Sequence, residues 1–503
     1  MKLSKLLKEI DDYVINNKED DPDIKNIFYN SNNVTDESIF VAITGSKSDG
    51  HKYIEHAIQK GAKVIIAENE IKLPDNIINI RVKNSRKALA LIAKRFYNNP
   101  SDKLFLIGIT GTNGKTTTAY LIESILQNAG FKTGLIGTIE YKYNDQNFPN
   151  PLTTPESLDL HKIFAEMVNA GVNHVIMEVS SHALDLYRVY GCHYDICIFT
   201  NLTQDHLDYH KTLDHYKKCK KKLFFEPYLS KKNAAAIINN DDSLGTELSK
   251  EILTPLITTG MTYKINVYTN YYETKLDGTM LRIEYQKQIF DIQSNLYGKH
   301  NILNILSAIS VGIVKNIPFE IIVKAISKKG IIPGRLEKIA NNKSRYIFVD
   351  YAHTPDALEN VLLALKDKSE QRLICVFGCG GDRDTGKRPL MGNIAAKIAD
   401  LLVVTSDNPR TEDPILIIKQ IISGIEKENL FKYNNLNIND FDKKVYIVEP
   451  DRKEAIKLAI SLSKPKDIVL IAGKGHENYQ IFKNKTIHFD DKKEALNALN
   501  NIN

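Results

Sequence analysis

A short glycine-rich loop, here called the phosphate loop, is the part of this 503-residue chain that most directly predicts chemistry. It follows an apolar run and opens a helix-like stretch, a context in which backbone N–H groups and the helix N-terminus bind phosphate. The Lys115 amine would neutralise the phosphates of a nucleotide, and the Thr116 hydroxyl would coordinate Mg²⁺. The loop is shorter than the common G-x-x-x-x-G-K-T form, which would place glycine at Ile109, but its context still favours nucleotide binding over an ordinary turn. It consists of Gly111, Thr112, Asn113, Gly114, Lys115, Thr116 and Thr117.

Side chains that prefer metal ions follow two other apolar runs. Glu178 comes directly after the run 174–177 and offers the hard oxygen that Mg²⁺ prefers, although a solvated carboxylate at a strand end is the alternative. His206 lies in the segment 205–210, Asp-His-Leu-Asp-Tyr-His, which taken alone could be a zinc cluster. Structural zinc sites usually take four close nitrogen or sulfur ligands. We expect His210 and His215 to be surface residues.

The elements that would position these groups alternate along the chain. Short apolar runs, typical of buried parallel strands, are each followed at once by polar or glycine-rich residues. Helix-like stretches such as 117–129 and 389–399 lie between them, which predicts an α/β fold. Because ligands bind beyond the carboxyl ends of strands in open α/β sheets, the polar clusters should gather at one site. The runs are 104–109, 174–177, 196–199, 346–349, 373–377, 401–404 and 468–472.

Length and composition favour a multidomain protein. A chain of 503 residues that is 43% hydrophobic can form about three domains, each with its own core. Breaks at the segments 98–101 and 331–334, which contain Pro100 and Pro333-Gly334, suggest the boundaries. We therefore predict domains at 1–100, 101–332 and 333–503.

The charge pattern argues against nucleic acids and membranes as partners. The formal net charge is +6, and no block combines clustered arginine with interleaved aromatic residues, although a mildly positive surface suits an anionic small molecule. No run approaches the ~18 apolar residues of a membrane span. Residues 1–12 carry Glu9, Asp11 and Asp12 where a signal peptide needs an apolar stretch. The five cysteines form no C-x-x-C pair and are odd in number, so we expect reduced thiols in the cytoplasm.

A series of motifs follows the phosphate loop in order along nearly the whole chain. Among them are Glu-Val-Ser-Ser-His-Ala-Leu at 178–184 and Val-Asp-Tyr-Ala-His-Thr-Pro at 349–355. Together with the loop, these motifs resemble the Mur ligase superfamily, which also contains the folylpolyglutamate synthetases. The motifs at 380–389, 407–410 and 473–477 resemble those of the members that add the third residue of the peptide. The remaining matches are 200–208, 298–304 and 334–337.

The resemblance implies three domains: a first that holds the uridine diphosphate end of the substrate, a central parallel-sheet ATPase domain with the phosphate loop, and a C-terminal Rossmann-like domain that closes over both. It implies a monomeric, Mg²⁺-dependent enzyme that uses ATP to add meso-diaminopimelate to UDP-N-acetylmuramoyl-L-alanyl-D-glutamate. ATP would phosphorylate the D-glutamate carboxylate, the amine would attack the acyl phosphate, and phosphate would leave. Because such chemistry is mostly positioning and charge neutralisation, cations should crowd the site.

The resemblance also implies a role for each matching residue. ATP would be bound by the phosphate loop with Asn301, Asn304, Arg335 and Asp350. The acceptor would be bound by Ser31, Thr153, Thr154, Ser180, Arg188 and Lys220. Diaminopimelate would be bound by Arg388, Asp407, Asn408, Arg410, Gly473 and Glu477. The metal ligands would be Thr116, Glu178, His206 and Lys220, and the catalytic residues Lys115, Glu178, His206, Lys220 and His353.

Lys220 is the residue for which pattern and resemblance differ most. It belongs to a lysine-rich run at 217–222, whose simplest interpretation is a solvated helix face, and periodicity does not single it out. Its spacing from 215–216 and 223–224 aligns it with the carbamylated lysine of the family. A lysine reacts with CO₂ only as the neutral amine, so its surroundings would have to lower its pKa.

Two positions depart from the family pattern. Asn32 stands where arginine is usual, and Leu186 stands where some members carry glutamine.

Three other functions stay open. The alternatives are the same reaction with L-lysine, a folylpolyglutamate synthetase, and a nucleotide-binding module without catalysis. The complete set of metal-binding candidates argues against the last, and a first domain of this type argues against the second. The Asp-Asn-Pro-Arg segment at 407–410 favours diaminopimelate over lysine, because an arginine can pair bidentately with the additional carboxylate.

Overall fold

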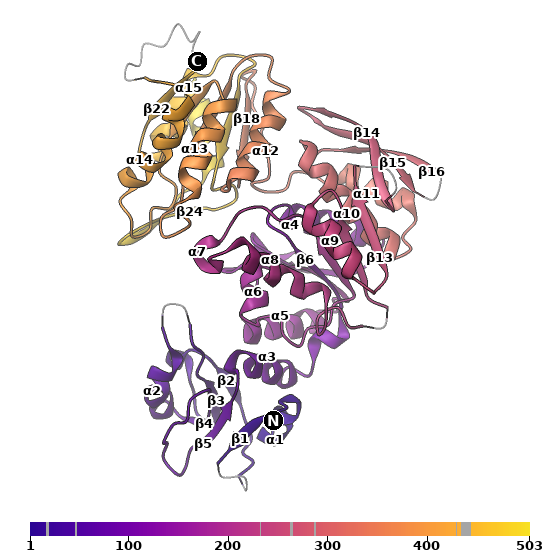
Figure 1. The fold of residues 1–503 in the computed structure, drawn as a ribbon, viewed down its shortest axis with the longest axis vertical. Helices are drawn as coiled ribbons and strands as arrows, with labels where there is room; N and C mark the ends of the chain where they lie inside the picture. Colours follow the sequence, from indigo (N-terminus) through magenta and orange to yellow (C-terminus); the bar gives the residue numbers. More distant parts are fainter. Residues whose placement is uncertain are drawn as a thin grey trace.

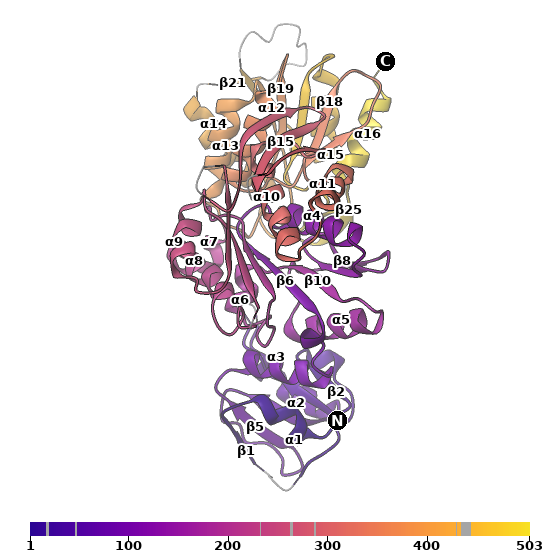
Figure 2. The same ribbon diagram turned by 90° about the vertical axis from the view of Figure 1, so that its right-hand side faces the viewer.

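The computed structural model shows three domains in a row along the long axis of the molecule (Figure 1). Each domain has its own β-sheet and hydrophobic core. Figure 2 shows the N-terminal domain at one end, the C-terminal domain at the other, and the middle domain between them. The structure describes residues 1–16, 20–45, 48–231, 233–261, 265–285, 288–428, 430–433 and 444–502.

The N-terminal domain is a five-stranded sheet with short helices. Its strand order is β1-β5-β4-β3-β2, in which β1 pairs antiparallel and the other strands are parallel. Helix α3 packs toward the middle domain, where the Tyr29 hydroxyl donates a hydrogen bond to Asp159 at 2.6 Å. The elements are α1 (Leu3–Leu6), β1 (Tyr13–Ile15), β2 (Asn26–Phe28), β3 (Ser38–Val41), α2 (Ile54–Gln59), β4 (Ala62–Ala67), β5 (Ile78–Val82) and α3 (Ser85–Phe96).

The middle domain is built on an eleven-stranded sheet in the order β16-β15-β14-β13-β12-β11-β6-β10-β7-β8-β9. The strands from β14 to β7 are parallel, and antiparallel hairpins extend both edges. The central strands are apolar and fully buried because helices cover both faces, with α4 and α10 on one face and α5 and α9 on the other. The elements are β6 (Phe105–Thr110), α4 (Lys115–Asn128), β7 (Thr133–Ile136), β8 (Glu140–Tyr143), β9 (Gln146–Pro149), α5 (Ser157–Asn169), β10 (His174–Glu178), α6 (Ser181–Asp185), β11 (Ile196–Phe199), α7 (Leu207–His210), α8 (Leu213–Lys221), β12 (Ala235–Asn239), α9 (Ser243–Glu251), β13 (Leu256–Gly260), β14 (Val267–Lys275), β15 (Gly278–Tyr285), β16 (Gln288–Ser294), α10 (Lys299–Val314) and α11 (Phe319–Lys328).

The C-terminal domain has a seven-stranded sheet in the order β17-β18-β23-β19-β20-β22-β21, parallel apart from the edge strand β17. Two cores lie on its two faces, one under α12, α13 and α14 and the other under α15 and α16. The elements are β17 (Glu337–Ile339), β18 (Tyr346–Asp350), α12 (Pro355–Lys366), β19 (Leu373–Phe377), α13 (Lys387–Ile398), β20 (Leu401–Val404), α14 (Pro414–Ile425), β21 (Phe431–Lys432), β22 (Val445–Val448), α15 (Arg452–Leu462), β23 (Ile468–Ala472), β24 (Tyr479–Phe482), β25 (Lys485–His488) and α16 (Asp491–Asn500).

The predicted strand-and-helix alternation is confirmed. Every apolar run named above forms a buried strand whose ends differ from the expected ones by at most one residue. These strands are neighbours in two sheets, β11-β6-β10 in the middle domain and β18-β23-β19-β20 in the C-terminal domain. The α/β fold with three domains therefore places the polar motifs at the carboxyl ends of adjacent strands. Among the described residues, no helix is both long enough and apolar enough to cross a bilayer.

Candidate active site between the middle and C-terminal domains

The phosphate loop connects β6 to α4 and has the geometry of an anion-binding turn. Gly111 and Gly114 have φ values of +152° and +85°, which favour glycine. Gly114 has a second reason to be glycine, because a Cβ there would lie 2.3 Å from Asn304 Oδ1. The Lys115 amine donates hydrogen bonds to two carbonyls of its own loop, at 2.9 and 2.8 Å. Burial lowers the pKa of Lys115, so an anionic phosphate would favour its charged form.

Glu178 and Thr116 form a pair of hard oxygen donors beside the loop. Glu178 ends β10 and is buried, and the Thr116 hydroxyl donates to its Oε1 at 2.9 Å. Thr138 fixes the same carboxylate, because its N–H donates to Oε1 and its hydroxyl to Oε2, both at 2.9 Å. Gly137 also packs closely against this carboxylate, because a Cβ there would lie 2.5 Å from Glu178 Oε1. The pair offers two of the oxygen ligands that Mg²⁺ prefers.

Lys220 is the buried member of the lysine-rich run 217–222. Its amine donates to the Gly111 carbonyl at 2.7 Å and lies 4.4 Å from the centre of the Tyr216 ring. The other lysines of the run form ion pairs with carboxylates. Burial, and then the charge of Lys115, lower the pKa of Lys220 well below its usual value. This shift favours the neutral amine, which is the form that carbamylation requires.

Asp205 lies between two histidines that come from different domains. Its Oδ2 is 3.3 Å from His206 Nε2 and 4.0 Å from His353 Nε2. The His353 Nδ1 donates to the Tyr351 carbonyl at 2.8 Å, which leaves Nε2 facing Asp205. Burial lowers the pKa of His206 to about 3 and that of His353 to about 4, so both imidazoles are neutral at neutral pH. Asp205 was not predicted as a site residue, although its place directly before His206 was the available signal.

Direct contacts join the C-terminal domain to the phosphate loop. The Arg335 guanidinium donates to the Thr116 hydroxyl at 3.0 Å, and the Asn113 amide donates to Asp356 Oδ2 at 2.8 Å. Asp350 is buried and accepts backbone N–H groups from the Arg335 turn and from the loop after β18, at 2.6 and 2.7 Å. Burial raises the pKa of Asp350 to about 6. Asp350 therefore shapes the turn that carries Arg335 to the phosphate loop.

A cavity of about 220 Å³ lies between these two domains and collects most of the predicted nucleotide and metal residues. A second cavity of about 330 Å³ adjoins it at Asn304 and contains Asn239, Lys299 and His300, which were not predicted as site residues. Inside α10, the Asn304 amide donates to Asn301 Oδ1 at 2.9 Å. The first cavity is lined by residues 112–117 of the phosphate loop and by Thr153, Glu178, Ser180, His206, Asn301, Asn304, Arg335, Asp350 and His353.

The predicted acceptor residues of the middle domain lie together beside the end of β10. The Thr154 hydroxyl donates to the Glu178 carbonyl at 2.8 Å and accepts the Ser180 N–H at 3.1 Å. The Arg188 guanidinium donates to the Thr154 carbonyl at 3.2 Å. Thr153 and Ser180 both line the cavity that contains Glu178. These residues therefore form one polar wall next to the Thr116–Glu178 pair.

Ser31 lies apart from this wall, in a short 3₁₀ turn of the N-terminal domain. It is buried, and its hydroxyl is 3.1 Å from His56 Nδ1; no contact among the described residues joins it to the middle-domain wall. Beside it, Lys60 donates to the Asn32 carbonyl at 2.8 Å. A cation therefore lies next to this position, although the side chain of Asn32 is neutral.

The predicted amino-acid-binding residues after β20 and β23 form a polar cluster around Lys474. The Lys474 amine is fully buried and donates to Asn408 Oδ1 at 3.1 Å and to Glu477 Oε2 at 3.0 Å. It also lies 3.6 Å from Asp407 Oδ1. Gly473 has a φ of +116°, and a Cβ there would meet Asp407 Oδ2 at 2.7 Å. Lys474 was not predicted, and its position inside the 473–477 motif was the one signal that could have identified it.

The two predicted arginines of this region differ in what they contact. Arg410 has a φ of +52°, and its guanidinium donates to backbone carbonyls at 2.8 and 3.4 Å. In the described part of the chain it pairs with no carboxylate. Arg388 is fully buried and donates two hydrogen bonds to Glu412, each of 2.8 Å. Arg410 can therefore receive a carboxylate, whereas Arg388 already holds one.

Replacing Arg388 with alanine should destabilise the C-terminal domain. The change removes the donor of Glu412, whose side chain is 29% exposed, and breaking such a pair costs roughly 3 kcal/mol, the lower end for buried pairs. We expect calorimetry to show a melting temperature lower by roughly 6–12 °C. The control is Arg383→Ala, an exposed arginine just before α13, which should leave the melting temperature unchanged. An unaltered melting temperature in Arg388→Ala would contradict a supporting role.

The expectation that His210 is a surface residue is wrong, whereas His215 is exposed as expected. His210 is 2% exposed, and its ring packs against the rings of His182 and Tyr216. The reason is that α7 is a four-residue helix, so its last side chain turns back toward α6 and α8. Its Nε2 lies 2.9 Å from the Ser181 hydroxyl.

Sequence comparisons match three consecutive segments to Mur ligase domains. Residues 23–97 match the Mur ligase family catalytic domain, residues 109–312 match the Mur ligase middle domain, and residues 334–475 match the Mur ligase glutamate ligase domain. The matches cover most of the chain and include the phosphate loop and, of the polar cluster, Asp407, Asn408 and Lys474.

Individual relatives extend over the whole chain. The chain is 44% identical to the UDP-N-acetylmuramoyl-L-alanyl-D-glutamate--2,6-diaminopimelate ligase of Clostridium tetani (strain Massachusetts / E88), over 99% of this chain and 100% of the relative. It is 42% identical to the protein of that name from Bacillus velezensis (strain DSM 23117 / BGSC 10A6 / LMG 26770 / FZB42), over the full length of both. A solved structure with that name is 30% identical, has a TM-score of 0.68 and covers 99% of each chain. This chain therefore belongs to the Mur ligase family and is an ATP-dependent ligase.

Proposed function

We propose that this protein adds meso-2,6-diaminopimelate to the D-glutamate of UDP-N-acetylmuramoyl-L-alanyl-D-glutamate, with ATP as the energy source, in the synthesis of peptidoglycan precursors. The observation that supports this most is the gathering of the phosphate loop, Glu178, Arg335 and His353 around one interdomain cavity. The relatives that carry the name of this ligase are 40–44% identical over nearly the whole chain.

The proposed reaction begins with attack of the D-glutamate carboxylate on the γ-phosphorus of ATP, which releases ADP. The amine of diaminopimelate then attacks the acyl carbon, and the tetrahedral intermediate expels phosphate. Lys115 and Arg335 would neutralise charge on the transferred phosphoryl group, since both lie at the phosphate loop and come from the two domains that enclose it. The Arg335–Thr116 contact would hold the domains together while the acyl phosphate is protected from water.

The donor atoms fit Mg²⁺ as the metal of this reaction. Thr116 and Glu178 supply a hydroxyl and a buried carboxylate 2.9 Å apart, both hard oxygen ligands. His206 supplies a neutral imidazole, and Lys220 would become a ligand only as a carbamate. Bound Mg²⁺ would neutralise the phosphate oxygens. The role of the protein would be to hold these donors beside the phosphate loop.

Lys220→Ala should lose activity at least about tenfold more than Lys218→Ala or Lys222→Ala. The reason is burial, because Lys220 donates to a carbonyl of the phosphate loop, whereas Lys218 and Lys222 form ion pairs at 2.7 and 3.1 Å with Asp214 and Asp185. Activity is measured as phosphate release, and carbamylation as the mass of the intact protein in bicarbonate buffer.

Recovery of Lys220→Ala activity by an added short carboxylate would support the carbamate further. Equal effects of all three substitutions would contradict it and favour a solvated helix face.

Phosphate release from a mixture of ATP, the UDP-linked dipeptide and a single amino acid tests the whole proposal. We expect release with meso-diaminopimelate, little with L-lysine, and none without the dipeptide. Release with a folate substrate and L-glutamate would instead support the folylpolyglutamate reaction, and binding of ATP without turnover would support a non-catalytic module. The folylpolyglutamate synthase of Mycobacterium tuberculosis is 15% identical with a TM-score of 0.62, a likeness of fold alone.

We also propose the domain boundaries 1–100, 101–332 and 333–503, because the three large sheets fall within these segments. We further propose that the protein is a monomer and that it acts in the cytoplasm, without nucleic-acid or membrane partners. This assembly and this location suit a reaction on soluble precursors. Sedimentation of the purified protein and fractionation of cells would test these two statements.

A further inference from the structure

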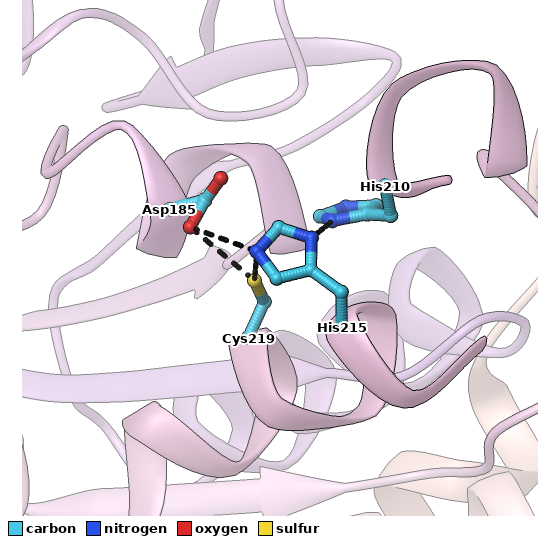
Figure 3. A group of neighbouring side chains, drawn as sticks. All are labelled: Asp185, His210, His215 and Cys219. Carbon is cyan, nitrogen blue, oxygen red and sulfur yellow. Dashed lines mark hydrogen bonds and ion pairs between the residues drawn. The ribbon is translucent and has the colours of Figure 1, made fainter. Parts of the chain in front are cut away.

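A cluster of four potential metal-binding side chains lies beside the candidate active site and has no role in the reaction proposed above. Asp185 ends α6, His210 ends α7, and His215 and Cys219 lie one turn apart on α8 (Figure 3). Cys219 and His210 are buried, whereas Asp185 and His215 are partly exposed. Three separate helices therefore converge on a set of sulfur, nitrogen and oxygen donors that solvent can reach through His215.

The distances among three of these donors, from Asp185, His215 and Cys219, resemble those of a tetrahedral site. Asp185 Oδ1 is 3.4 Å from Cys219 Sγ and 3.7 Å from His215 Nε2, and the last two atoms are also 3.7 Å apart. One ligand atom from each residue, His210 included, can be chosen so that all lie within 4.8 Å of one another. The ligands of tetrahedral zinc are separated by roughly 3.3–3.8 Å, since the metal–ligand bonds are about 2.0–2.3 Å long. The His215 ring faces Asp185 and Cys219 with Nε2 and His210 with Nδ1, so this exposed ring has to turn before all four donors can face one ion.

The donors also have the outer partners that metal ligands usually need. His210 Nε2 lies 2.9 Å from the Ser181 hydroxyl, an arrangement that can hold the proton on Nε2 and leave the Nδ1 lone pair facing His215. His210 Nδ1 is 3.2 Å from His215 Nδ1. The Tyr209 hydroxyl donates to Asp185 Oδ2 at 3.0 Å, so Oδ1 is the oxygen that faces the cluster.

Lys222 opposes a cation at this place, because its amine lies 3.1 Å from Asp185 Oδ1. Its side chain is 38% exposed, so it can turn into solvent, and its amine already lies 5.9 Å from the centre of the Tyr187 ring. A Cys219 thiolate and the Asp185 carboxylate would together balance the two charges of a zinc ion. The thiol proton leaves to solvent when the metal binds.

We propose that Asp185, His210, His215 and Cys219 form a zinc site that joins α6, α7 and α8. Four protein ligands leave no open position, which is typical of a structural site and not of a catalytic one. Zinc is favoured over Mg²⁺ because cysteine and histidine are ligands that hard cations avoid. The three helices carry Ser180, His206 and Lys220 at or near their ends, so the ion would brace the elements that support the active site.

Zinc and cobalt binding to the full-length protein tests this site. The protein is stripped with a chelator, kept under a non-thiol reductant, and supplied with excess Mg²⁺ to fill the hard-oxygen sites. We expect one Zn²⁺ per chain and, with Co²⁺, the near-ultraviolet charge-transfer band of a thiolate ligand. Zinc should also raise the melting temperature of the parent protein.

Two variants and one control decide the outcome. Cys219→Ala should abolish the thiolate band, and Cys219→Ala and His215→Ala should each weaken zinc binding at least tenfold and remove the zinc-dependent rise in melting temperature. His215 is exposed, so its replacement should leave the fold intact. Cys379→Ala removes a buried free cysteine outside the cluster and should behave as the parent. Absence of stoichiometric zinc, or a thiolate band that persists in Cys219→Ala, would overturn the site.

Discussion

Lys115→Ala should lower kcat by about 10²–10³, the loss typical when a charge-neutralising group is removed from a water-poor site. The Lys115 amine stands at the N-terminus of α4, and its hydrogen bonds to described residues go to two carbonyls of the phosphate loop, at 2.9 and 2.8 Å. Phosphate oxygens are better partners for an ammonium than peptide carbonyls are, so ATP should replace both contacts. The amine would then follow the charge that develops as the γ-phosphoryl group is transferred. The rate is measured as phosphate release at saturating substrates.

The fold should survive this change because other hydrogen bonds hold the phosphate loop in place. The Gly111 carbonyl also accepts the Lys220 amine at 2.7 Å, and the loop is fixed by the Thr112 N–H, which donates to the Asn201 carbonyl at 2.9 Å. Lys132→Ala, an exposed lysine after the same helix, is the control and should keep the parent rate. A Lys115→Ala protein that turned over near the parent rate would contradict the proposed role of the loop.

The fold could be predicted from the sequence largely because the sheets are parallel. A strand buried on both faces needs a continuous apolar run, and such runs are easy to recognise in a sequence. The run 468–472 forms β23 in the interior of its sheet, between β18 and β19, and its composition does not predict this position. The antiparallel edges were not predicted, because strands such as β14 carry many exposed polar residues.

The site was predictable where one motif supplies the whole geometry, as in the phosphate loop. It was not predictable where the partner lies far away in sequence. Asp356 contacts Asn113 across 243 positions of the sequence. The motif around Arg388 likewise does not show that its partner is Glu412. Five lysines within six residues also look alike in sequence, and only the packing of α8 decides that Lys220 points inward.

The preference for meso-diaminopimelate over L-lysine should depend on Arg410. Diaminopimelate carries a carboxylate where lysine has none, and an arginine fork can bind it bidentately. Arg410 is preset for this role, since its N–H donates to the Ile481 carbonyl at 3.0 Å and its guanidinium packs against Gly380, where a Cβ would lie 2.9 Å from Nη1. Nearby, Glu477 offers a carboxylate for the distal ammonium. A polar site of this kind rejects an analogue that lacks the recognised group by up to ~10⁴–10⁵.

The measurement is kcat/KM for the two amino acids in the parent protein and in two variants. Arg410→Ala should lose most of the preference, chiefly through a lower kcat/KM for diaminopimelate. Arg410→Lys should recover only part of it, because an ammonium keeps the charge but not the planar fork. Arg383→Ala is the control. Burial, and then the charge of the exposed Arg383, lower the pKa of Arg410, so Arg383 is a cation of the same region. An equal loss of preference in Arg383→Ala would show that local positive charge, and not the position of the Arg410 fork, sets the preference. If the parent protein used L-lysine as efficiently as diaminopimelate, the specificity would be disproved, whereas the ligase chemistry at the phosphate loop would not be affected.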